Sequence, residues 1–227
     1  ILPTAVITET SPQTSCDPAN PNGVLTASVL VGGVPQNTAD YTYEWFRGDN
    51  TLPANLHTTV SGVNGSVANK VEGGGVFYTV KVKSALNCTD TEKLIISEDI
   101  NVPVITLTAA DNSICDPLLA GTAFNGTLTA TVTFKGVPVA DFSDYKFNWF
   151  DGTQVTDPAI AVANNKNPIL NQLDGGFYTA TVDLISLGCK SLPDTEEVIN
   201  SSVLPVITTN AIGSTNCIPA LANGSAI

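Results

Sequence analysis

The chain has 227 residues, and its 9 Lys and Arg against 21 Asp and Glu give a formal net charge of −12. A chain this acidic is not expected to bind the phosphate backbone of nucleic acids or an anionic membrane surface. Hydrophobic residues make up 43% of the sequence and charged residues 13%, which favours folded domains over disorder. No apolar run approaches the roughly 18 residues that mark a membrane-spanning helix, so we expect no membrane insertion.

The sequence contains an internal repeat whose matching pieces keep their order at offsets of 99 to 104 residues. The pieces are Cys-x-Pro at Cys16, Cys115 and Cys217, Asn-Gly at Asn22, Asn125 and Asn223, Trp-Phe at Trp45 and Trp149, Gly-x-Phe-Tyr-Thr at 75–79 and 175–179, the second cysteines Cys88 and Cys189, and Asp-Thr-Glu at 90–92 and 194–196. Units of this length are large enough to hold a core of their own.

We therefore predict one domain at 1–102, a second at 103–204, and the N-terminal part of a third at 205–227. The sequence begins without Met or a signal peptide and ends at Ile227 within an apolar alternation. We expect it to be a section of a longer mature polypeptide.

Alternation of apolar and polar residues with a period of two predicts about seven short strands in each repeat and no amphipathic helix. The predicted strands lie near 4–10, 24–31, 41–47, 57–61, 67–71, 76–83 and 93–97, and near 104–109, 127–134, 144–150, 159–163, 168–172, 176–184 and 195–200. Short strands separated by turn residues predict an all-β fold. Each repeat is expected to be an immunoglobulin-like antiparallel β-sandwich, and the two to lie end to end in a rod.

Four aromatic residues mark the predicted cores. Trp45 and Trp149 lie on the third strand of each repeat, where aromatic residues alternate along one face. Tyr78 and Tyr178 follow a Gly-x-x-Tyr pattern that is typical of a tyrosine corner. In that arrangement the ring packs inward and its hydroxyl bonds back to a loop.

The cysteine spacing predicts one disulfide within each repeat. The expected pairs are Cys16 with Cys88 and Cys115 with Cys189, at separations of 72 and 74 residues. Each bridge would join the connection after the first strand to the turn before the last, at one end of the sandwich, and contribute roughly 4 kcal/mol. Free buried thiols are the alternative, and no Cys-x-x-Cys or Cys/His cluster indicates a metal site. Cys217 occupies the position of a first cysteine, so we expect it to be unpaired by truncation.

The junction between the repeats is short, and its Pro103 stiffens the backbone. Glu98, Asp99, Asn101 and Asp111 cluster around it and form a candidate calcium site, since Ca²⁺ prefers oxygen ligands and such sites can rigidify a rod. Solvated acidic side chains are the alternative, because no EF-hand pattern is present and the second junction offers only an Asn-Ser-Ser run.

The residue inventory argues against an enzyme. The single histidine, His57, has no counterpart in the second repeat, so no Ser-His-Asp or Cys-His arrangement is available. The Arg47-Gly48-Asp49 tripeptide has the form of an integrin-binding signal, but ordinary turn chemistry explains Gly-Asp equally well. We expect no catalytic residue and no cofactor other than the candidate calcium ion.

With Cys-Asp-Pro, Asn-Gly-x-Leu-Thr-Ala, Tyr-x-Trp-Phe and Gly-x-Phe-Tyr-Thr in tandem units, the chain resembles the immunoglobulin-like repeats of giant Bacteroidota-type cell-surface adhesins, the SprB-like adhesins of gliding motility. The resemblance covers the whole chain and is one of style and spacing. It implies export, display as a long filament, and attachment to surfaces or polysaccharide.

We therefore expect a structural and adhesive segment of an extracellular, cell-surface filament. Its expected partners are neighbouring repeats of the same chain and an external surface or polysaccharide. Disulfides agree with an oxidising, extracellular location. Two alternatives stay open at this point: a spacer or carbohydrate-binding module of a secreted enzyme, and a subunit of a strand-exchanged fibre.

Overall fold

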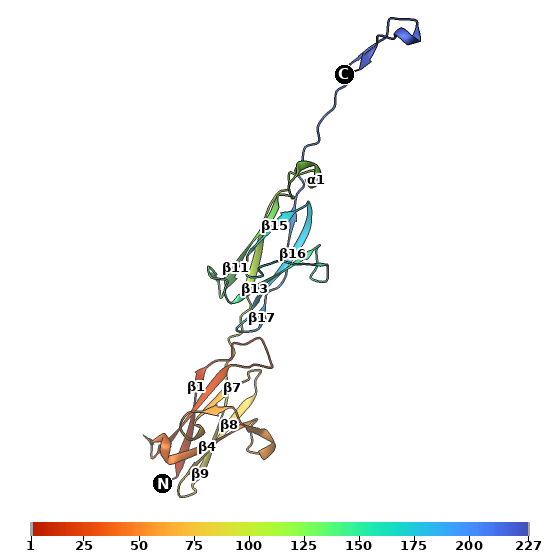
Figure 1. Cartoon of the computed structure of the whole chain (residues 1–227). Helices are drawn as coiled ribbons and strands as arrows, with labels where there is room; N and C mark the ends of the chain where they lie inside the picture. Colours follow the sequence, from red (N-terminus) through yellow and green to blue (C-terminus); the bar gives the residue numbers. More distant parts are fainter. Residues whose placement is uncertain (1, 227) are drawn as a thin grey trace.

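The computed structural model describes residues 2–226 and places two all-β sandwiches end to end, repeat 1 nearer the N-terminus and repeat 2 following it (Figure 1). One sheet of repeat 1 has the order β1-β2-β7-β6, with β3 beside β2, and the other has the order β5-β4-β8-β9. The strands are β1 (Pro3–Ser11), β2 (Gly23–Val31), β3 (Val34–Pro35), β4 (Tyr41–Arg47), β5 (Leu56–His57), β6 (Val60–Ser61), β7 (Val67–Val71), β8 (Phe77–Ser84) and β9 (Thr89–Ile95).

Repeat 2 follows the same plan. One sheet joins β10, β11, β12 and β15, and the other joins β14, β13, β16, β17 and β18. The strands are β10 (Val104–Ala110), β11 (Gly126–Phe134), β12 (Val137–Pro138), β13 (Tyr145–Asp151), β14 (Ala159–Ile160), β15 (Ile169–Leu173), β16 (Gly176–Leu184), β17 (Cys189–Lys190) and β18 (Asp194–Val198).

The named strands pair antiparallel throughout, and the sheet that holds the third strand also holds the last two long strands. This division of strands is that of the immunoglobulin-like sandwich, as the alternation predicted. Strand 57–61 of the prediction is divided in two: β5 pairs with β4 in one sheet, whereas β6 pairs with β7 in the other. The chain changes sheets at Thr58 and Thr59.

Within residues 2–226, helical structure is limited to short turns. They are α1 (Pro117–Ala120) and 3-10 turns at Thr38–Asp40, Pro53–Asn55, Val63–Gly65 and Pro219–Leu221. Asp116 caps α1, since its carboxylate accepts hydrogen bonds from the backbone N–H groups of Leu118 and Leu119 at 2.8 and 3.2 Å. None of the helices within residues 2–226 has the length and apolar character needed to cross a bilayer.

Each sandwich is packed around its tryptophan. Trp45 is 0% exposed and Trp149 2% exposed, and both lie in clusters of buried aliphatic and aromatic residues. The indole N–H of Trp45 donates to the carbonyl of Gly65 at 2.9 Å, whereas that of Trp149 has no partner. The two cores therefore differ by one buried hydrogen bond.

The two buried tyrosines form tyrosine corners. The hydroxyl of Tyr178 donates to the carbonyl of Asp174 at 3.2 Å, and the hydroxyl of Tyr78 accepts from the backbone N–H of Glu72 at 3.3 Å. In both repeats the tyrosine thus fixes the loop that leads into its own strand.

The strand directions define two poles for each sandwich: a lower pole nearer the N-terminus and an upper pole nearer the C-terminus. In repeat 1, Tyr41 pairs with Ser84 and Pro3 pairs with Val31, so β4 begins and β8 ends at the lower pole. The 12–22 loop between β1 and β2 lies at the upper pole. The segment after repeat 2 leads away from the sandwich and carries a small hairpin of β19 (Ala211–Ile212) and β20 (Ser225–Ala226) (Figure 1).

Candidate functional site: the clasp between the two repeats

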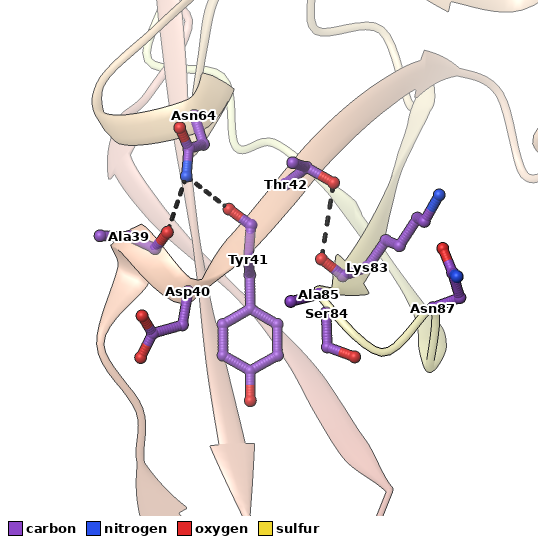
Figure 2. Close-up of a pocket in the computed structure, with 9 residues that line it drawn as sticks. All are labelled: Ala39, Asp40, Tyr41, Thr42, Asn64, Lys83, Ser84, Ala85 and Asn87. Carbon is purple, nitrogen blue, oxygen red and sulfur yellow. Dashed lines mark hydrogen bonds between the residues drawn. The ribbon is translucent and has the colours of Figure 1, made fainter.

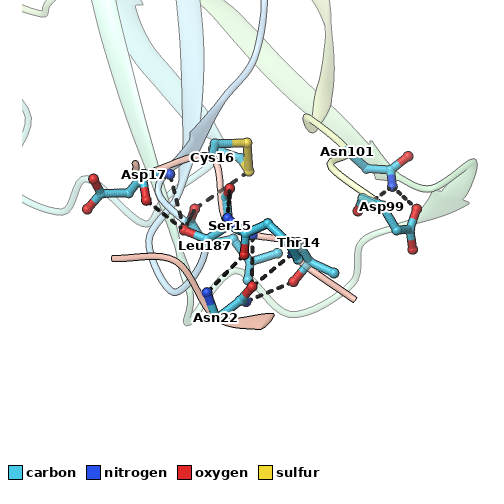
Figure 3. The surroundings of a disulfide bond; sticks show 10 residues. Thr14, Ser15, Cys16, Asp17, Asn22, Asp99, Asn101 and Leu187 are labelled. Carbon is cyan, nitrogen blue, oxygen red and sulfur yellow. Dashed lines mark hydrogen bonds between the residues drawn. A yellow bond between two sulfur atoms is a disulfide. The ribbon is translucent and has the colours of Figure 1, made fainter. Parts of the chain in front are cut away.

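A disulfide joins the two sandwiches. Cys16, on the upper-pole loop of repeat 1, is bonded to Cys189, which follows the lower-pole turn of repeat 2 (Figure 3). Their Cα atoms are 4.9 Å apart although 173 residues separate them in sequence. Cys189 is fully buried, and Cys16 packs against the core of repeat 2. We call this disulfide and its surrounding contacts the clasp.

The predicted pairing within each repeat was wrong. Cys16 does not bond Cys88, and Cys115 does not bond Cys189; within residues 2–226 Cys88, Cys115 and Cys217 are free. The physical reason is the strand topology. The first cysteine of each repeat lies at the upper pole and the second at the lower pole, so the two are at opposite ends of one sandwich. The first cysteine of one repeat instead meets the second cysteine of the next.

Backbone hydrogen bonds accompany the disulfide. The N–H of Cys16 donates to the carbonyl of Leu187 at 2.8 Å, and the hydroxyl of Ser15 donates to the same carbonyl at 3.2 Å. Gly188 has a φ of 63°, and a Cβ atom at this position would lie 2.9 Å from that of Asp17. Glycine suits this position because it adopts the left-handed backbone easily and because it leaves room for the close approach of the two repeats.

An asparagine holds the Cys16 loop in shape. The side-chain oxygen of Asn22 accepts from the N–H groups of Thr14 and Ser15 at 2.8 and 3.2 Å, and its amide donates to the Thr14 hydroxyl at 2.8 Å (Figure 3). The side chain of Gln13 closes the loop by accepting from Asn22 N–H at 2.8 Å. The asparagine of the recurring Asn-Gly pair therefore holds the loop closed through side-chain hydrogen bonds, and the pair does not form a hairpin turn. We call this set of hydrogen bonds the asparagine lock.

The same lock recurs at the two later copies of the loop. Asn125 accepts from the N–H of Ser113 at 2.8 Å, and Asn223 accepts from the N–H of Thr215 at 2.8 Å. The glycine that follows each asparagine lies close to the backbone of a neighbouring segment. A Cβ at Gly126, for example, would lie 2.5 Å from the carbonyl oxygen of Leu173. The sequence repeat thus preserves the hydrogen bond between the asparagine and the segment before the cysteine three times, although the second loop is longer and holds α1.

The linker leaves repeat 1 along this loop. Gln13 forms a parallel bridge with Glu98, in which Gln13 N–H donates to the carbonyl of Ser97 and Asp99 N–H donates to the carbonyl of Gln13, both at 2.9 Å. Asn112 and Asn200 form the same bridge at the top of repeat 2. Each upper pole therefore sets the direction in which the chain leaves.

An ion pair adds to the junction. The ammonium of Lys135, on the turn between β11 and β12 of repeat 2, contacts the carboxylate of Asp99 in the linker. Both side chains are about half exposed, so the pair contributes little to stability. The hydrogen bond from Lys135, followed by that from Asn101, holds the pKa of Asp99 below its usual value.

The candidate calcium ligands do not converge. Asp99 is engaged by Lys135 and Asn101, whereas Glu98 accepts from the N–H of Gly74 at 2.7 Å. Asp111 is exposed, and no three acidic, histidine or cysteine side chains of residues 2–226 form a group that could hold a metal ion. At this junction the acidic side chains serve as hydrogen-bond and ion-pair partners.

The other candidates are spread over repeat 1. His57 lies against Tyr78 at 5.4 Å between ring centroids, and its Nε2 is 2.8 Å from the carbonyl oxygen of Asn69. The guanidinium of Arg47 contacts the carboxylate of Glu72, which raises the pKa of Arg47 and lowers that of Glu72. His57 and Arg47 both lie beside Tyr78, and His57 also pairs with Trp45 across β4 and β5.

A hollow on repeat 1 lies at the lower pole, far from the clasp. It has a volume of about 380 Å³ and is lined by the start of β4, Asn64 and the turn that ends in Cys88 (Figure 2). Its hydrogen bonds are internal: Asn64 donates to the carbonyls of Ala39 and Tyr41 at 3.0 and 2.8 Å. A second hollow of about 340 Å³ beside it includes Cys88 and Leu86.

No model of a known protein family matches the chain, and no curated protein sequence matches it. Among solved structures, it is similar to three N-terminal domains of the highly immunogenic outer capsid protein of bacteriophage RB49, at 15% identity and a TM-score of 0.42, over 95% of this chain and 61% of that one. It is also similar to murine CEACAM1b, at 14% identity and a TM-score of 0.31, over 88% of this chain and all of that one. The fold assignment rests on the strand order of the chain itself.

Sequence reasoning found the residues of the clasp but not their pairing. The predicted strand order nevertheless contained the information needed to assign the pairing. In an immunoglobulin-like sandwich, the connection between the first two strands and the turn between the last two lie at opposite ends. Applied to the predicted strands, this rule separates Cys16 from Cys88 and leaves a partner in the neighbouring repeat.

Proposed function

We propose that the chain is a load-bearing section of an extracellular, cell-surface stalk of the adhesin type. The observation that carries this proposal is the Cys16–Cys189 bond between successive sandwiches. A chain whose domains only needed to be spaced apart would require no covalent bond across the junction. A covalent bond, backbone hydrogen bonds and a fixed linker exit together make two domains behave as one stiff rod.

The clasp also determines how tension passes through the chain. A pulling force on the two ends runs from the N-terminus to Cys16, crosses the disulfide to Cys189, and continues towards the C-terminus. The residues between the two cysteines, which include most of both sandwiches, lie outside this path. The bond thus shields most of both cores from extension, with β1 and β18 left in the path of the force, which suits a filament that anchors a cell under load.

Single-molecule force spectroscopy on the full chain tests this proposal. With the disulfide formed, only the segments before Cys16 and after Cys189 extend. After reduction, unfolding releases the 173-residue separation as additional length of about 500–600 Å, at roughly 3.4 Å per residue. Equal extension of the oxidised and reduced chains would contradict a load-bearing role. The Cys16→Ser variant should extend like the reduced chain under both conditions.

The adhesive part of the proposal rests on the resemblance to adhesin repeats and on the abundance of Thr, Ser and Asn on outward strand positions. Beads that carry the full chain, in contact with a polysaccharide gel under flow, test it. Retention that rises steeply with chain density, as multivalent weak binding requires, supports adhesion. Retention no greater than that of uncoated beads would leave the section a stalk whose adhesive surface lies elsewhere. We propose no catalytic activity for it.

A further inference from the structure

We propose that the clasp recurs at both outer poles of this two-repeat unit: Cys88 and Cys115 each form the same disulfide with a further repeat of this type in the same polypeptide. The inference goes beyond the load-bearing role above, and it does not need the adhesive role. It rests on the two halves of the clasp, each of which appears a second time without its partner.

The lower pole of repeat 1 presents the turn that docks at the observed clasp. Leu86-Asn87-Cys88 corresponds to Leu187-Gly188-Cys189 in the sequence repeat. Asn87 has a φ of 62° and Gly188 a φ of 63°, so the two turns share the same left-handed residue before the cysteine. Leu86 is 87% exposed, whereas Leu187 is partly buried against the core of repeat 2. The free turn therefore shares with the docked turn the left-handed residue before its cysteine, and it presents an exposed apolar side chain beside that cysteine.

The upper pole of repeat 2 presents the loop that receives such a turn. Cys115 is exposed, and its loop is held by a hydrogen bond to Asn125. The loop of Cys16 is held by Asn22 in the same way. The exit of the following linker is also fixed in the same way, because Ser201 N–H donates to the carbonyl of Asn112 at 2.7 Å. Next to Cys115, the side chains of α1 include Leu118 and Leu119, which are 92% and 88% exposed.

The occupant that fits both poles is another repeat of the same kind. Its lower-pole turn would bring a cysteine to Cys115, and its upper-pole loop would bring one to Cys88. The chain itself contains a third copy of the loop, in which Asn223 holds the segment before Cys217. Two differences must be accommodated. Asn87 has a side chain where Gly188 has none, so a loop docked on Cys88 must shift outward. The Cys115 loop also holds α1 and has four more residues between its cysteine and its asparagine than the Cys16 loop, so a turn docked on Cys115 must leave room for α1.

The chemistry is that of the observed bond. Two thiols lose two protons and two electrons to a disulfide oxidant, such as oxidised glutathione, which leaves as two thiols. Because Cys115 lies inside the loop that Cys16 and Cys189 close, its bond to a later repeat would overlap that loop. Successive disulfides would then interlock, and tension would pass along the stalk from one covalent loop to the next.

A double-length chain tests the inference, with residues 1–204 of one copy joined to residues 3–227 of a second. This fusion keeps the repeat register, because Leu204-Pro205 corresponds to Leu2-Pro3. In the test variant, Cys88→Ser is placed in the first copy and Cys115→Ser in the second. The remaining Cys115 and Cys88 then face each other across the new junction. The matched control carries the opposite choice, which leaves its two cysteines at the outermost poles.

Both chains are refolded with oxidised glutathione at micromolar concentration, alkylated and digested with trypsin. Cys16–Cys189 peptides in both copies show that every repeat has folded. We expect the Cys115–Cys88 peptide pair in the test variant at about 100-fold the yield of the control, since tethering gives a millimolar effective concentration. Free, alkylated Cys115 and Cys88 in the test variant, or equal yields in the two chains, would overturn the inference while leaving the observed clasp intact.

Discussion

At the scale of single residues, the clasp depends on side chains that hold one loop in shape. Asn22 makes three hydrogen bonds to Thr14 and Ser15, and these bonds determine where Cys16 points. Each such hydrogen bond contributes about 1 kcal/mol net to the free energy of unfolding, so Asn22 stabilises the upper pole substantially. The recurrence of Asn-Gly in all three copies follows from this task.

Replacing Asn22 by Ala should therefore destabilise repeat 1 by about 2–3 kcal/mol, because three hydrogen bonds are lost and two backbone N–H groups lose their partner. Chemical denaturation of the oxidised chain measures this. Asn223→Ala is the matched control, since it removes the same lock from the hairpin after repeat 2. A stability change below about 0.5 kcal/mol is expected for it. Equal effects of the two substitutions would contradict the role assigned to Asn22.

The two tryptophans allow a second comparison. Trp45→Phe removes buried area and the hydrogen bond to Gly65, whereas Trp149→Phe removes buried area alone. We expect the first substitution to be more destabilising than the second by about 1 kcal/mol or more. Denaturation curves of the two variants, followed by circular dichroism, test this. An equal loss would mean that the indole N–H of Trp149 also has a partner in solution.

At the scale of strands and loops, much of the structure could be predicted from the sequence. The period-two alternation placed β1, β2, β4, β7 and β8 to within about two residues, because each has one face in the core. The small elements could not be predicted in this way. The two-residue strands β5 and β6 have no alternation to show, and α1 exists because Asp116 caps four residues rather than because they form an apolar stripe.

The turn that docks into the clasp yields a prediction of its own. Gly188→Ala would put a methyl group 2.9 Å from the Cβ of Asp17 and strain a left-handed backbone. Gly136→Ala has the same backbone strain, at a φ of 75°, but no heavy atom within 4 Å of its Cβ. We expect only Gly188→Ala to make Cys16–Cys189 about tenfold easier to reduce. Titration with glutathione buffers measures this, and equal shifts for the two variants would argue against a close approach at Asp17.

At the scale of the whole molecule, the relation between the repeats was the part that sequence reasoning missed. The short linker and the Pro at the junction correctly favoured a rod, but the cysteines were assigned to separate domains. Spacing along the chain does not show which pole of a sandwich a loop occupies. The strand order does, and it brings Cys16 to Cys189 while keeping Cys16 away from Cys88.

The ion pair at the junction makes a small, acid-sensitive contribution to the stiffness of the reduced rod. Because Lys135 lowers the pKa of Asp99 in the folded chain, the pair stabilises the junction at neutral pH, and this contribution is lost as the pH falls through the lowered pKa, below the ordinary value of 3.8. Small-angle X-ray scattering of the reduced chain should show slightly greater bending once the pH falls below the lowered pKa of Asp99 than at pH 7. Lys135→Gln should remove this difference, and a wild-type chain whose scattering does not change with pH would contradict the assignment.

Disulfide mapping of the oxidised 227-residue chain tests the clasp most directly. Cleavage after Lys and Arg places each cysteine on a separate peptide, at 1–47, 84–93, 94–135, 167–190 and 191–227. The structure predicts that 1–47 is joined to 167–190 and that the other three peptides carry alkylated thiols. Joining of 1–47 to 84–93 and of 94–135 to 167–190 would contradict it, because each bond would then lie within one repeat.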